Sequence, residues 1–504
     1  MSAADRERAV VDAVPSELFI DGRWRPSSGG KTFDVEDPAT GKMLRAVADA
    51  TPEDGMVALD AAVAAQTGWA QHPPRERGEI LRRAYELMMQ RQDDLALLMT
   101  LEMGKPLAES RAEVAYAAEF FRWFAEEAVR IDGGFATAPN GAGRVLVMRQ
   151  PVGPSLLITP WNFPAAMGTR KIGPAVAAGC TMVLKPASLT PLSMLALTGI
   201  LAECGLPEGV LNVVPTASSG RLMEPLIRDG RARKLSFTGS TEVGRRLLEQ
   251  CAEQIVRTSM ELGGNAPFLV FADADLDAAV QGAMVAKMRN IGEACTAANR
   301  FYVHADVVDE FSRRLAERMG SLRIGRGSEE GVQVGPLIEA KARDKVQHLV
   351  DDAVARGARV LVGGESMDGP GYFYRPTVLV DVPPDAEMAS TEIFGPVAPI
   401  TPFASEDEVL ATANGTPFGL VSYVYTNDLH RALRVCERLE AGMVGLNQGL
   451  VSNPAAPFGG VKHSGLGREG GTVGIEEYLE TKYVAIATTR AGPTRPRSRG
   501  GLAR

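Results

Sequence analysis

Residues 234–244 read KLSFTGSTEVG, which is a short apolar strand, a glycine-containing turn and the start of a helix. Similar apolar stretches occur on both sides of it: PSLLI (154–158), TMVL (181–184), LNVV (211–214) and SMEL (259–262). Each stretch runs into a turn with Gly, Pro or Ser and then into a helical pattern. This alternation is typical of βαβ units, so the segment predicts an open parallel sheet.

A second series of strands begins near Pro267: PFLVF (267–271), FYVHA (301–305), ARVLVGG (358–364), TVLVDV (377–382), VSYVYT (421–426) and MVGLN (443–447). We place the boundary between the two series at 261–265, where ELGGN carries a glycine pair, and expect the chain to return toward the first unit over 445–470. Ahead of both, 17–35 predicts short strands around a turn. Amphipathic helices are predicted at 53–69, 75–99 and 106–130. The predicted fold class is α/β, with two Rossmann-like open parallel sheets.

The composition and the net charge limit the classes of function that the chain can have. The chain has 504 residues, 45% hydrophobic and 23% charged, which is ordinary globular usage with room for about two to four domains. A net charge of −8 gives no reason to expect a nucleic acid as partner. No stretch reaches the ~18 apolar residues of a membrane helix, so no membrane partner is expected. Residues 1–15 lack the apolar core of a signal peptide, which predicts a cytoplasmic protein.

Cysteine and histidine usage gives no sign of disulfides or of a metal site. The 5 cysteines form no C-x-x-C pair, which fits reduced thiols. The 5 histidines are scattered without ligand spacing, so no protein-bound metal is expected. The basic segment 490–504 predicts a solvated, disordered tail.

Four segments of the sequence are candidates for catalysis or ligand binding. Each could instead have a purely structural role. The turn at 237–244 presents free N–H groups to an anion, although no G-x-G-x-x-G follows any strand. Cys295, in the polar segment RNIGEACTAANR (289–300), is a nucleophile or a small buried apolar residue. Glu261 ends a predicted strand and faces a cleft, or is a hinge carboxylate. Asn162, in TPWNFP (159–164), could donate an amide hydrogen bond or be a turn asparagine.

Taken in order, these motifs resemble the NAD(P)-dependent aldehyde dehydrogenase family over residues 17–487. The resemblance rests on TPWNFP, KPAS (185–188), FTGSTEVG, ELGGNAP (261–267), the cysteine segment, EIFGP (392–396) and PFGGVKHSGLGRE (457–469). Within the family the chain is most similar to the branch that oxidises succinate semialdehyde, through residues 161–188 and 464–484. The resemblance implies an aldehyde-dehydrogenase-like fold, in which a small β-strand flap serves oligomerisation.

The resemblance implies a catalytic role for each of three residues. Cys295 would attack the aldehyde and form a thiohemiacetal, which gives hydride to the nicotinamide and leaves a thioester. The amide of Asn162 and the backbone N–H of Cys295 would form the oxyanion hole. Glu261 would act as general base on the water that hydrolyses the thioester. The implied product is a free acid, so the implied reaction converts succinate semialdehyde to succinate.

The resemblance also implies a cofactor site. Lys185 would bind the adenosine ribose, Gly239 and Ser240 the pyrophosphate, and Glu392 the nicotinamide ribose. The whole implied cofactor set is Thr159, Pro160, Trp161, Lys185, Ala187, Ser188, Phe237, Thr238, Gly239, Ser240, Gly244, Leu262, Glu392 and Phe394. NAD-selective relatives often carry Glu where this chain has Ser188, and a glutamate would repel a 2′-phosphate. We therefore expect NADP to be accepted and preferred over NAD.

The substrate implied is a small aldehyde with a terminal carboxylate. Arg170, Arg289 and Ser452 match the family's carboxylate-binding residues, and two arginines can clamp a carboxylate. Glu293 and Ala297 depart from the pattern: Ala297 removes a second thiol, and Glu293, if ionised, could weaken binding of an acidic substrate. Glutarate semialdehyde or a broader range of aldehydes is the enzymatic alternative. A structural or binding protein without turnover is the alternative from another class.

The resemblance divides the chain into domains. Residues 1–134 and 153–262 would form the nicotinamide-cofactor-binding domain, and 263–450 the catalytic domain that carries the nucleophile. Residues 135–152 and 477–489 would be oligomerisation strands. We therefore expect a homodimer or a homotetramer.

Overall fold

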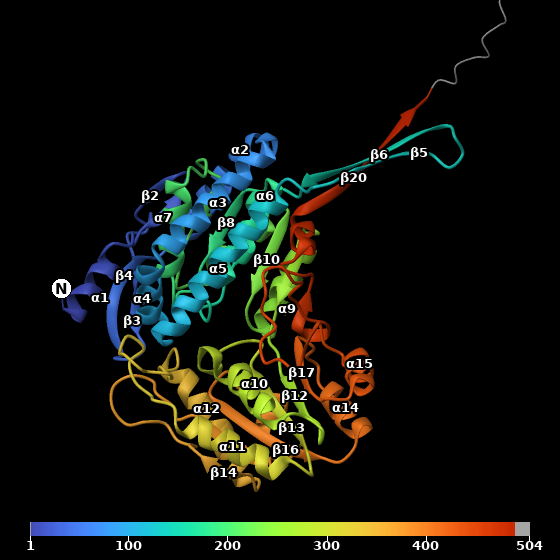
Figure 1. The fold of residues 1–504 in the computed structure, drawn as a ribbon. Coiled ribbons are helices and arrows are strands. Elements are labelled where there is room, and N and C mark those ends of the chain that lie inside the picture. Colours follow the sequence, from blue (N-terminus) through green and yellow to red (C-terminus); the bar gives the residue numbers. More distant parts are fainter. Residues whose placement is uncertain (1, 489–504) are drawn as a thin grey trace, which may run out of the picture.

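A computed structural model describes residues 2–488, so the predicted tail at 490–504 lies outside the described residues. Two large sheets dominate the structure, and the predicted α/β class with two parallel-sheet units is confirmed (Figure 1). The first sheet has eight strands in the order β19-β11-β10-β7-β8-β9-β1-β2. They span Gly465–Leu466, Arg257–Glu261, Lys234–Thr238, Ser155–Ile158, Met182–Lys185, Leu211–Val213, Leu18–Ile20 and Arg23–Arg25. The run from β11 to β9 is parallel, as the sequence predicts.

Helices cover this first sheet. The N-terminal part of the chain adds further helices and two short strands. The helices that connect its strands are α6 (Ala166–Ala178), α7 (Leu192–Glu203), α8 (Ser219–Arg228) and α9 (Thr241–Ala252). The N-terminal elements are α1 (Ala3–Asp12), β3 (Thr32–Asp37), β4 (Lys42–Ala48), α2 (Pro52–Gln71), α3 (Pro74–Gln90), α4 (Gln92–Met103) and α5 (Leu107–Glu127). The sequence analysis did not identify α1. This polar helix begins with a capping box formed by Ser2 and Asp5.

The prediction of one helix over 75–99 is wrong, because the chain turns at Arg91 into a second helix. Arg91 has φ −101° and ψ 18°, outside the helical region. Helix α3 is amphipathic and buries one face, whereas α4 is buried continuously over 95–103. A straight continuation of α3 could not bury all sides of the following turns. The bend at Arg91 therefore takes the apolar segment into the interior.

The second sheet has seven strands in the order β14-β15-β16-β13-β12-β17-β18. They span Arg359–Val362, Thr377–Val380, Val397–Phe403, Ala298–His304, Ala266–Val270, Val421–Tyr425 and Met443–Leu446. All neighbours pair in parallel except β14 with β15. Its helices are α10 (Leu276–Met288), α11 (Val308–Gly320), α12 (Ala340–Ala355), α13 (Glu387–Ser390), α14 (Glu406–Asn414) and α15 (Leu429–Arg438).

The two sheets are joined at the place where the site forms. The chain leaves the first sheet at Glu261 and enters the second at Ala266. It returns later as β19, which pairs antiparallel with β11 and places Gly465 opposite Glu261. Parallel sheets bind ligands outside the carboxyl ends of their strands. The loops that follow β7, β10 and β11 therefore face the second sheet across the junction.

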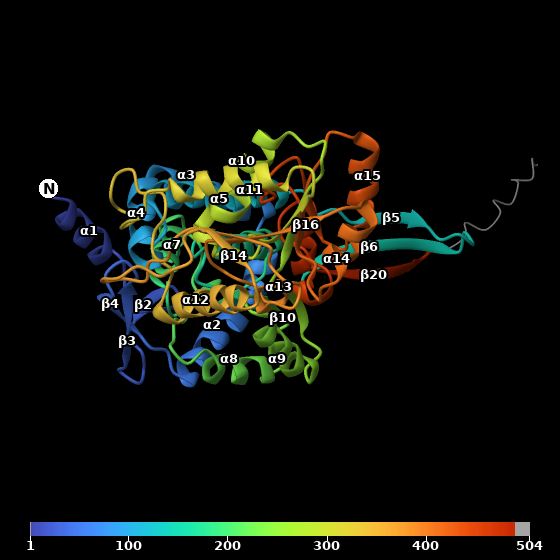
Figure 2. The ribbon, with the colours of Figure 1, turned by 90° about the horizontal axis from the view of Figure 1, so that it is seen from below.

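Three antiparallel strands extend away from the body: β5 (Gly134–Thr137), β6 (Gly143–Pro151) and β20 (Leu479–Ala487). Figures 1 and 2 show this flap at the end of the molecule opposite α1. Its side chains include exposed Phe135 and Tyr483, at 68% and 62% exposure. The flap coincides with the strands predicted at 135–152 and 477–489. Across residues 2–488, the structure contains no helix with the length and apolar character needed to cross a bilayer.

Candidate active site

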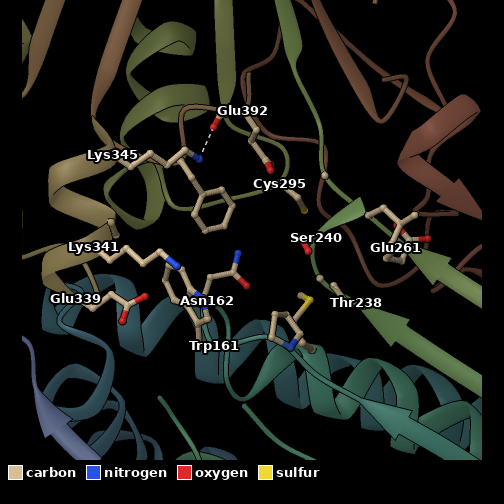
Figure 3. A pocket seen from close by; sticks show the side chains of 17 residues that line it. Trp161, Asn162, Thr238, Ser240, Glu261, Cys295, Glu339, Lys341, Lys345 and Glu392 are labelled. Carbon is tan, nitrogen blue, oxygen red and sulfur yellow. Dashed lines mark hydrogen bonds between the residues drawn. The ribbon is translucent and has the colours of Figure 1, made fainter. Parts of the chain in front are cut away.

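A cavity of about 530 Å³ lies at the junction of the two sheets (Figure 3). It brings together many of the predicted residues: Pro160, Trp161, Asn162, Thr238, Gly239, Ser240, Glu261, Leu262, Cys295, Glu392 and Phe394. Residues that the sequence analysis did not select also line it: Met167, Gly263, Glu339, Lys341, Ala342 and Lys345. Segments from both sheets and from α12 thus share one cavity.

Cys295 lies in the loop between the short helix η1 (Arg289–Gly292) and β13. Two consecutive residues of η1, Asn290 and Ile291, have φ of 55° and 61°. The left-handed region is rare for a β-branched residue, so this turn is strained. Cys295 is partly exposed to the cavity. Burial raises the pKa of its thiol to about 12, while the positive charge of Arg170 opposes the rise.

Asn162 follows β7 and is only 5% exposed. Its Nδ2 donates a hydrogen bond to the carbonyl oxygen of Glu293 at 2.9 Å, which ties it to the loop that carries Cys295. An amide nitrogen has two hydrogens, so one remains for a ligand. In Figure 3 the Asn162 amide and the Cys295 side chain extend into the cavity from different segments.

Glu261, the last residue of β11, is 3% exposed, and its Oε2 has no hydrogen-bond partner within the described chain. Burial and the nearby charge of Glu469 raise its pKa well above the usual range, whereas Arg170 and Lys171 lower it. Glu469 itself accepts hydrogen bonds from Arg170 Nε at 2.6 Å and from Lys171 Nζ at 2.5 Å. The charges around Glu261 therefore determine how strong a base it is.

The start of α9 provides an anion site for the predicted phosphates. Ser240 is the N-cap residue, and its side chain accepts a hydrogen bond from the N–H of Val243. A Cβ on Gly239 would lie 2.4 Å from the Phe237 ring, so any other residue there would force the ring to move. Thr238 Oγ1 is buried and unpartnered among residues 2–488. This open helix start beside an unsatisfied hydroxyl fits a dinucleotide pyrophosphate.

The six other predicted cofactor residues do not line this cavity. Lys185 is buried, its Nζ donates to Ser219 Oγ at 2.8 Å, and burial lowers its pKa to about 8. Gly244 packs against Leu262, where a Cβ would lie 2.5 Å from a side-chain carbon, so close packing accounts for that glycine. The cavity lining also omits four predicted residues: Thr159, Ala187, Ser188 and Phe237.

Glu392 and Phe394 close the opposite side of the cavity. Glu392 Oε1 accepts the N–H of Gly264 at 3.2 Å, and burial raises the pKa of this carboxyl to about 7. Lys345 Nζ donates to the backbone carbonyl of Glu392 at 2.7 Å. The Phe394 and Trp161 rings meet edge to face, with centroids 5.4 Å apart.

The predicted substrate residues occupy two different environments. Arg289 Nη1 donates to Ser452 Oγ at 3.1 Å, and its guanidinium lies 4.9 Å from the centre of the Phe163 ring. Arg170 is 1% exposed and bonded to Glu469, with its Nη2 unpartnered among the residues described. The structure brings Arg289 and Ser452 together, whereas Arg170 is committed in part to an internal ion pair.

Glu293, which the sequence places near the pocket, is fully buried and absent from the cavity lining. Its Oε1 accepts the N–H of Ile338 at 3.1 Å, and burial raises its pKa well above the usual range. Burial therefore favours the uncharged form of this side chain, and the side chain does not line the cavity.

Several buried charged residues of the site were missed by the sequence analysis: Lys105, Glu113, Lys171 and Glu469. Lys105 pairs with Glu113, and Lys171 with Glu469. All four are nearly inaccessible, although such residues are mostly exposed in proteins. The only sequence signal was a charged residue inside an apolar or glycine-rich stretch, as in LEMGKP (101–106).

The fold and the cavity place a partly exposed cysteine at the junction of two parallel-sheet units, and comparison with known proteins gives the family. The aldehyde dehydrogenase family model matches residues 24–484, and the chain belongs to this family. The chain is 60% identical over 445 residues to a succinate-semialdehyde dehydrogenase of Paenarthrobacter nicotinovorans, covering 88% of this chain and 99% of the relative.

Two further comparisons bear on substrate and cofactor. A glutarate-semialdehyde dehydrogenase of Pseudomonas putida is 53% identical over 471 residues, covering 94% of this chain and 98% of the relative. The crystal structure of an NADP-dependent enzyme from E. coli has 51% identity and a TM-score of 0.93, covering 95% of this chain and 99% of that one. The predicted aldehyde dehydrogenase fold is thereby confirmed.

The high pKa of Cys295 predicts slow alkylation in the cofactor-free protein. Only the thiolate reacts with iodoacetamide, so the rate at Cys295 should rise about tenfold per pH unit between pH 7 and 10. Mass spectrometry of the Cys295 peptide measures the rate. A short unstructured peptide with one internal cysteine is the control, because its rate levels off near the ordinary thiol pKa of about 8.5. A plateau at Cys295 below pH 9 would contradict the assigned environment.

Proposed function

We propose that this protein oxidises succinate semialdehyde to succinate with NAD(P). The observation that carries the proposal is the convergence of Cys295, Asn162 and Glu261 on one cavity. Arg289 and Ser452 do not line this cavity, but they are hydrogen-bonded to each other, and the charge of Arg289 lowers the pKa of the Cys295 thiol. The succinate-semialdehyde dehydrogenase at 60% identity supports the substrate. Glutarate semialdehyde is the second candidate, supported by the relative at 53% identity.

The chain's own residues account for the formation and stabilisation of the first intermediate. Cys295 attacks the aldehyde carbon as a thiolate, and Arg170 and Arg289 favour that thiolate by their charge. The aldehyde oxygen gains negative charge in this step. The free hydrogen of the Asn162 amide and the N–H of Cys295 can donate to it, and each such donor is worth about 3–4 kcal/mol in other enzymes.

The cofactor fits the surroundings of α9 described above. When bound, the nicotinamide would supply the acceptor for the hydride that the thiohemiacetal carbon gives up. Gly239 and Ser240 would hold the pyrophosphate, Glu392 the nicotinamide ribose, and Lys185 the adenosine ribose. Phe394 and Trp161 limit the space on the nicotinamide side of the cavity.

Glu261 completes the cycle as the general base. The thioester on Cys295 needs a water that has lost a proton, and Glu261 is the carboxylate that lines the cavity on the side of β11. A base is most effective when its pKa approaches the working pH, which for glutamate requires an upward shift. Burial and Glu469 supply this shift.

We further propose that NADP is preferred, that the protein is cytoplasmic, and that it forms a homodimer or homotetramer through the flap. Ser188 carries no negative charge to repel a 2′-phosphate, and Lys185 lies three residues away in sequence. The NADP-dependent E. coli enzyme supports this preference. The exposed aromatic side chains of the flap support burial against another copy.

The substrate assignment predicts how chain length and charge affect kcat/KM. Succinate semialdehyde should exceed butanal, which lacks the carboxylate, by on the order of 100-fold. Arg289→Met should remove most of this preference by raising KM for the semialdehyde, while the loss of its charge near the Cys295 thiol lowers the rates with both aldehydes alike. Ser452→Ala should have the same effect to a smaller degree.

The same steady-state assay separates the alternatives. A higher kcat/KM for glutarate semialdehyde would transfer the assignment to the five-carbon substrate. Butanal outperforming both semialdehydes would exclude the carboxylate-binding role of Arg289.

The base assignment predicts a burst. In Glu261→Gln the first turnover should release about one equivalent of reduced cofactor per active site, followed by turnover slowed about 10²–10⁴-fold. Stopped-flow absorbance of the reduced cofactor measures both phases. Cys295→Ser is the control and should show no burst. If the first turnover in Glu261→Gln is as slow as the later ones, Glu261 is not the deacylation base.

The cofactor assignment predicts the effect of a charge at Ser188. Ser188→Glu should raise KM for NADP on the order of 10–100-fold through like-charge repulsion, and leave KM for NAD unchanged or lower. Ser188→Gln has nearly the same size without the charge and is the matched control. Equal effects of the two substitutions on NADP would mean that size, not charge, matters at this position.

A further inference from the structure

The backbone carbonyl of Asn162 is held by two buried side chains from different parts of the chain. Lys105 Nζ donates to this oxygen at 2.9 Å, and Asn290 Nδ2 donates to it at 3.0 Å. A carbonyl oxygen has two lone pairs, so both are used. The peptide that carries the Asn162 side chain is therefore fixed in place from two directions.

Lys105 lies in the connection between α4 and α5, and its side chain is 1% exposed. It is ion-paired with Glu113, whose other oxygen accepts the N–H groups of Ala165 and Ala166 at 3.0 and 3.2 Å. These N–H groups lie at the start of α6, where a negative charge is favourable. One buried ion pair thus holds both the Asn162 carbonyl and helix α6, which begins four residues later.

Asn290 donates to the same Asn162 carbonyl oxygen from the segment 289–297, which contains Cys295 and is called the nucleophile loop below. Its Nδ2 also donates to the Glu293 carbonyl at 2.8 Å, and that oxygen is the one that accepts from Asn162 Nδ2. Its own N–H donates to a carboxylate oxygen of Glu109. Asn290 is fully buried and has φ 55°, a conformation that asparagine tolerates better than most residues. Its amide connects the two loops that face the cavity.

We infer that Lys105 and Asn290 are positioning residues of the oxyanion site, because they fix the Asn162 peptide and thereby aim its side-chain amide at the aldehyde oxygen. The inference rests on the proposed function. Within residues 2–488, the hydrogen bonds and the ring contact of Lys105 involve Glu113, Asn162 and Phe163, and none involves the nucleophile loop, residues 289–297. Its removal should therefore weaken the stabilisation of the oxyanion without changing the reactivity of the thiol.

The principal variant removes the ion pair as a unit. Lys105→Met with Glu113→Gln avoids leaving a buried carboxylate unpaired, and glutamine keeps an oxygen for the N–H groups of Ala165 and Ala166. Glu113→Gln alone is the matched control, because it retains the contact between Lys105 and Asn162. The second variant is Asn290→Gly, which keeps the left-handed backbone and removes the amide. Asn212→Gly is its control, because Asn212 is buried and donates to the carbonyls of Met182 and Gly209 away from the site.

The test measures two reactions of the same sulfur. The single-turnover rate of cofactor reduction, which needs the oxyanion site, should fall about 10–100-fold in both variants. Alkylation of Cys295 by iodoacetamide forms no oxyanion, and its rate should stay within about twofold in Lys105→Met/Glu113→Gln. Placing these substitutions in an Asn162→Ala background should cause no further loss of turnover, because they act through Asn162.

Three outcomes would overturn the inference: unchanged turnover, an equal loss of alkylation and turnover in the Lys105 variant, or losses that add fully to Asn162→Ala. If the Lys105 variant does not fold, Asn290→Gly provides the same turnover and additivity tests. Failure of the proposed function is distinguishable, because the wild type would then reduce no cofactor with any aldehyde. In that case crystal structures of the wild type and Asn290→Gly decide: a displaced Asn162 amide supports the inference and an unmoved amide overturns it.

Discussion

The hydrogen bond from Asn162 Nδ2 to the carbonyl of Glu293 joins residues 131 positions apart, and the active cavity depends on it. Asn162 follows a strand of the first sheet, and Glu293 precedes a strand of the second. Neither segment is regular secondary structure, so neither can satisfy its buried polar groups internally. Asn290, Lys105 and Glu109 supply the missing partners. Together they join two irregular loops, one with the proposed nucleophile Cys295 and the other with the proposed oxyanion donor Asn162.

The charged groups around Cys295 and Glu261 have opposing effects on the pKa values of these two side chains. Burial raises the pKa of both the Cys295 thiol and the Glu261 carboxyl, because a low-dielectric site disfavours either anion. Arg170 lowers both pKa values, and its charge is shared with Glu469 through a direct ion pair. Glu469 in turn raises the pKa of Glu261. The site can therefore favour one anion at a time, which suits a cycle in which the sulfur is an anion before acylation and the carboxylate acts after it.

Strand periodicity and motif order predicted most of the sheet strands and the residues that meet in the cavity, because the carboxyl ends of parallel strands converge whatever the details of packing. The prediction failed where tertiary packing overrode local pattern. The sequence analysis missed β16, whose segment VAPITPF contains two prolines, and treated α3 and α4 as one helix. Lys171 and Glu469 are 298 positions apart, and nothing local in either segment specifies that they pair. Buried ion pairs of this kind follow from the fold and could not be inferred before it.

The two arginines that resemble a carboxylate clamp differ in what they can do. Arg170 has Nε committed to Glu469 and lies against the Phe458 ring, so a change there would alter the environment of Glu261 as well as that of the substrate. Arg289 has only a serine hydroxyl as its hydrogen-bond partner among the described residues, and it lies on the same rigid loop as Cys295. Under the proposed function, recognition of the distant carboxylate and attack on the aldehyde would come from one stretch of chain, because Arg289 and Cys295 are six residues apart. The separation of these two side chains would then be one factor that selects the chain length of the substrate.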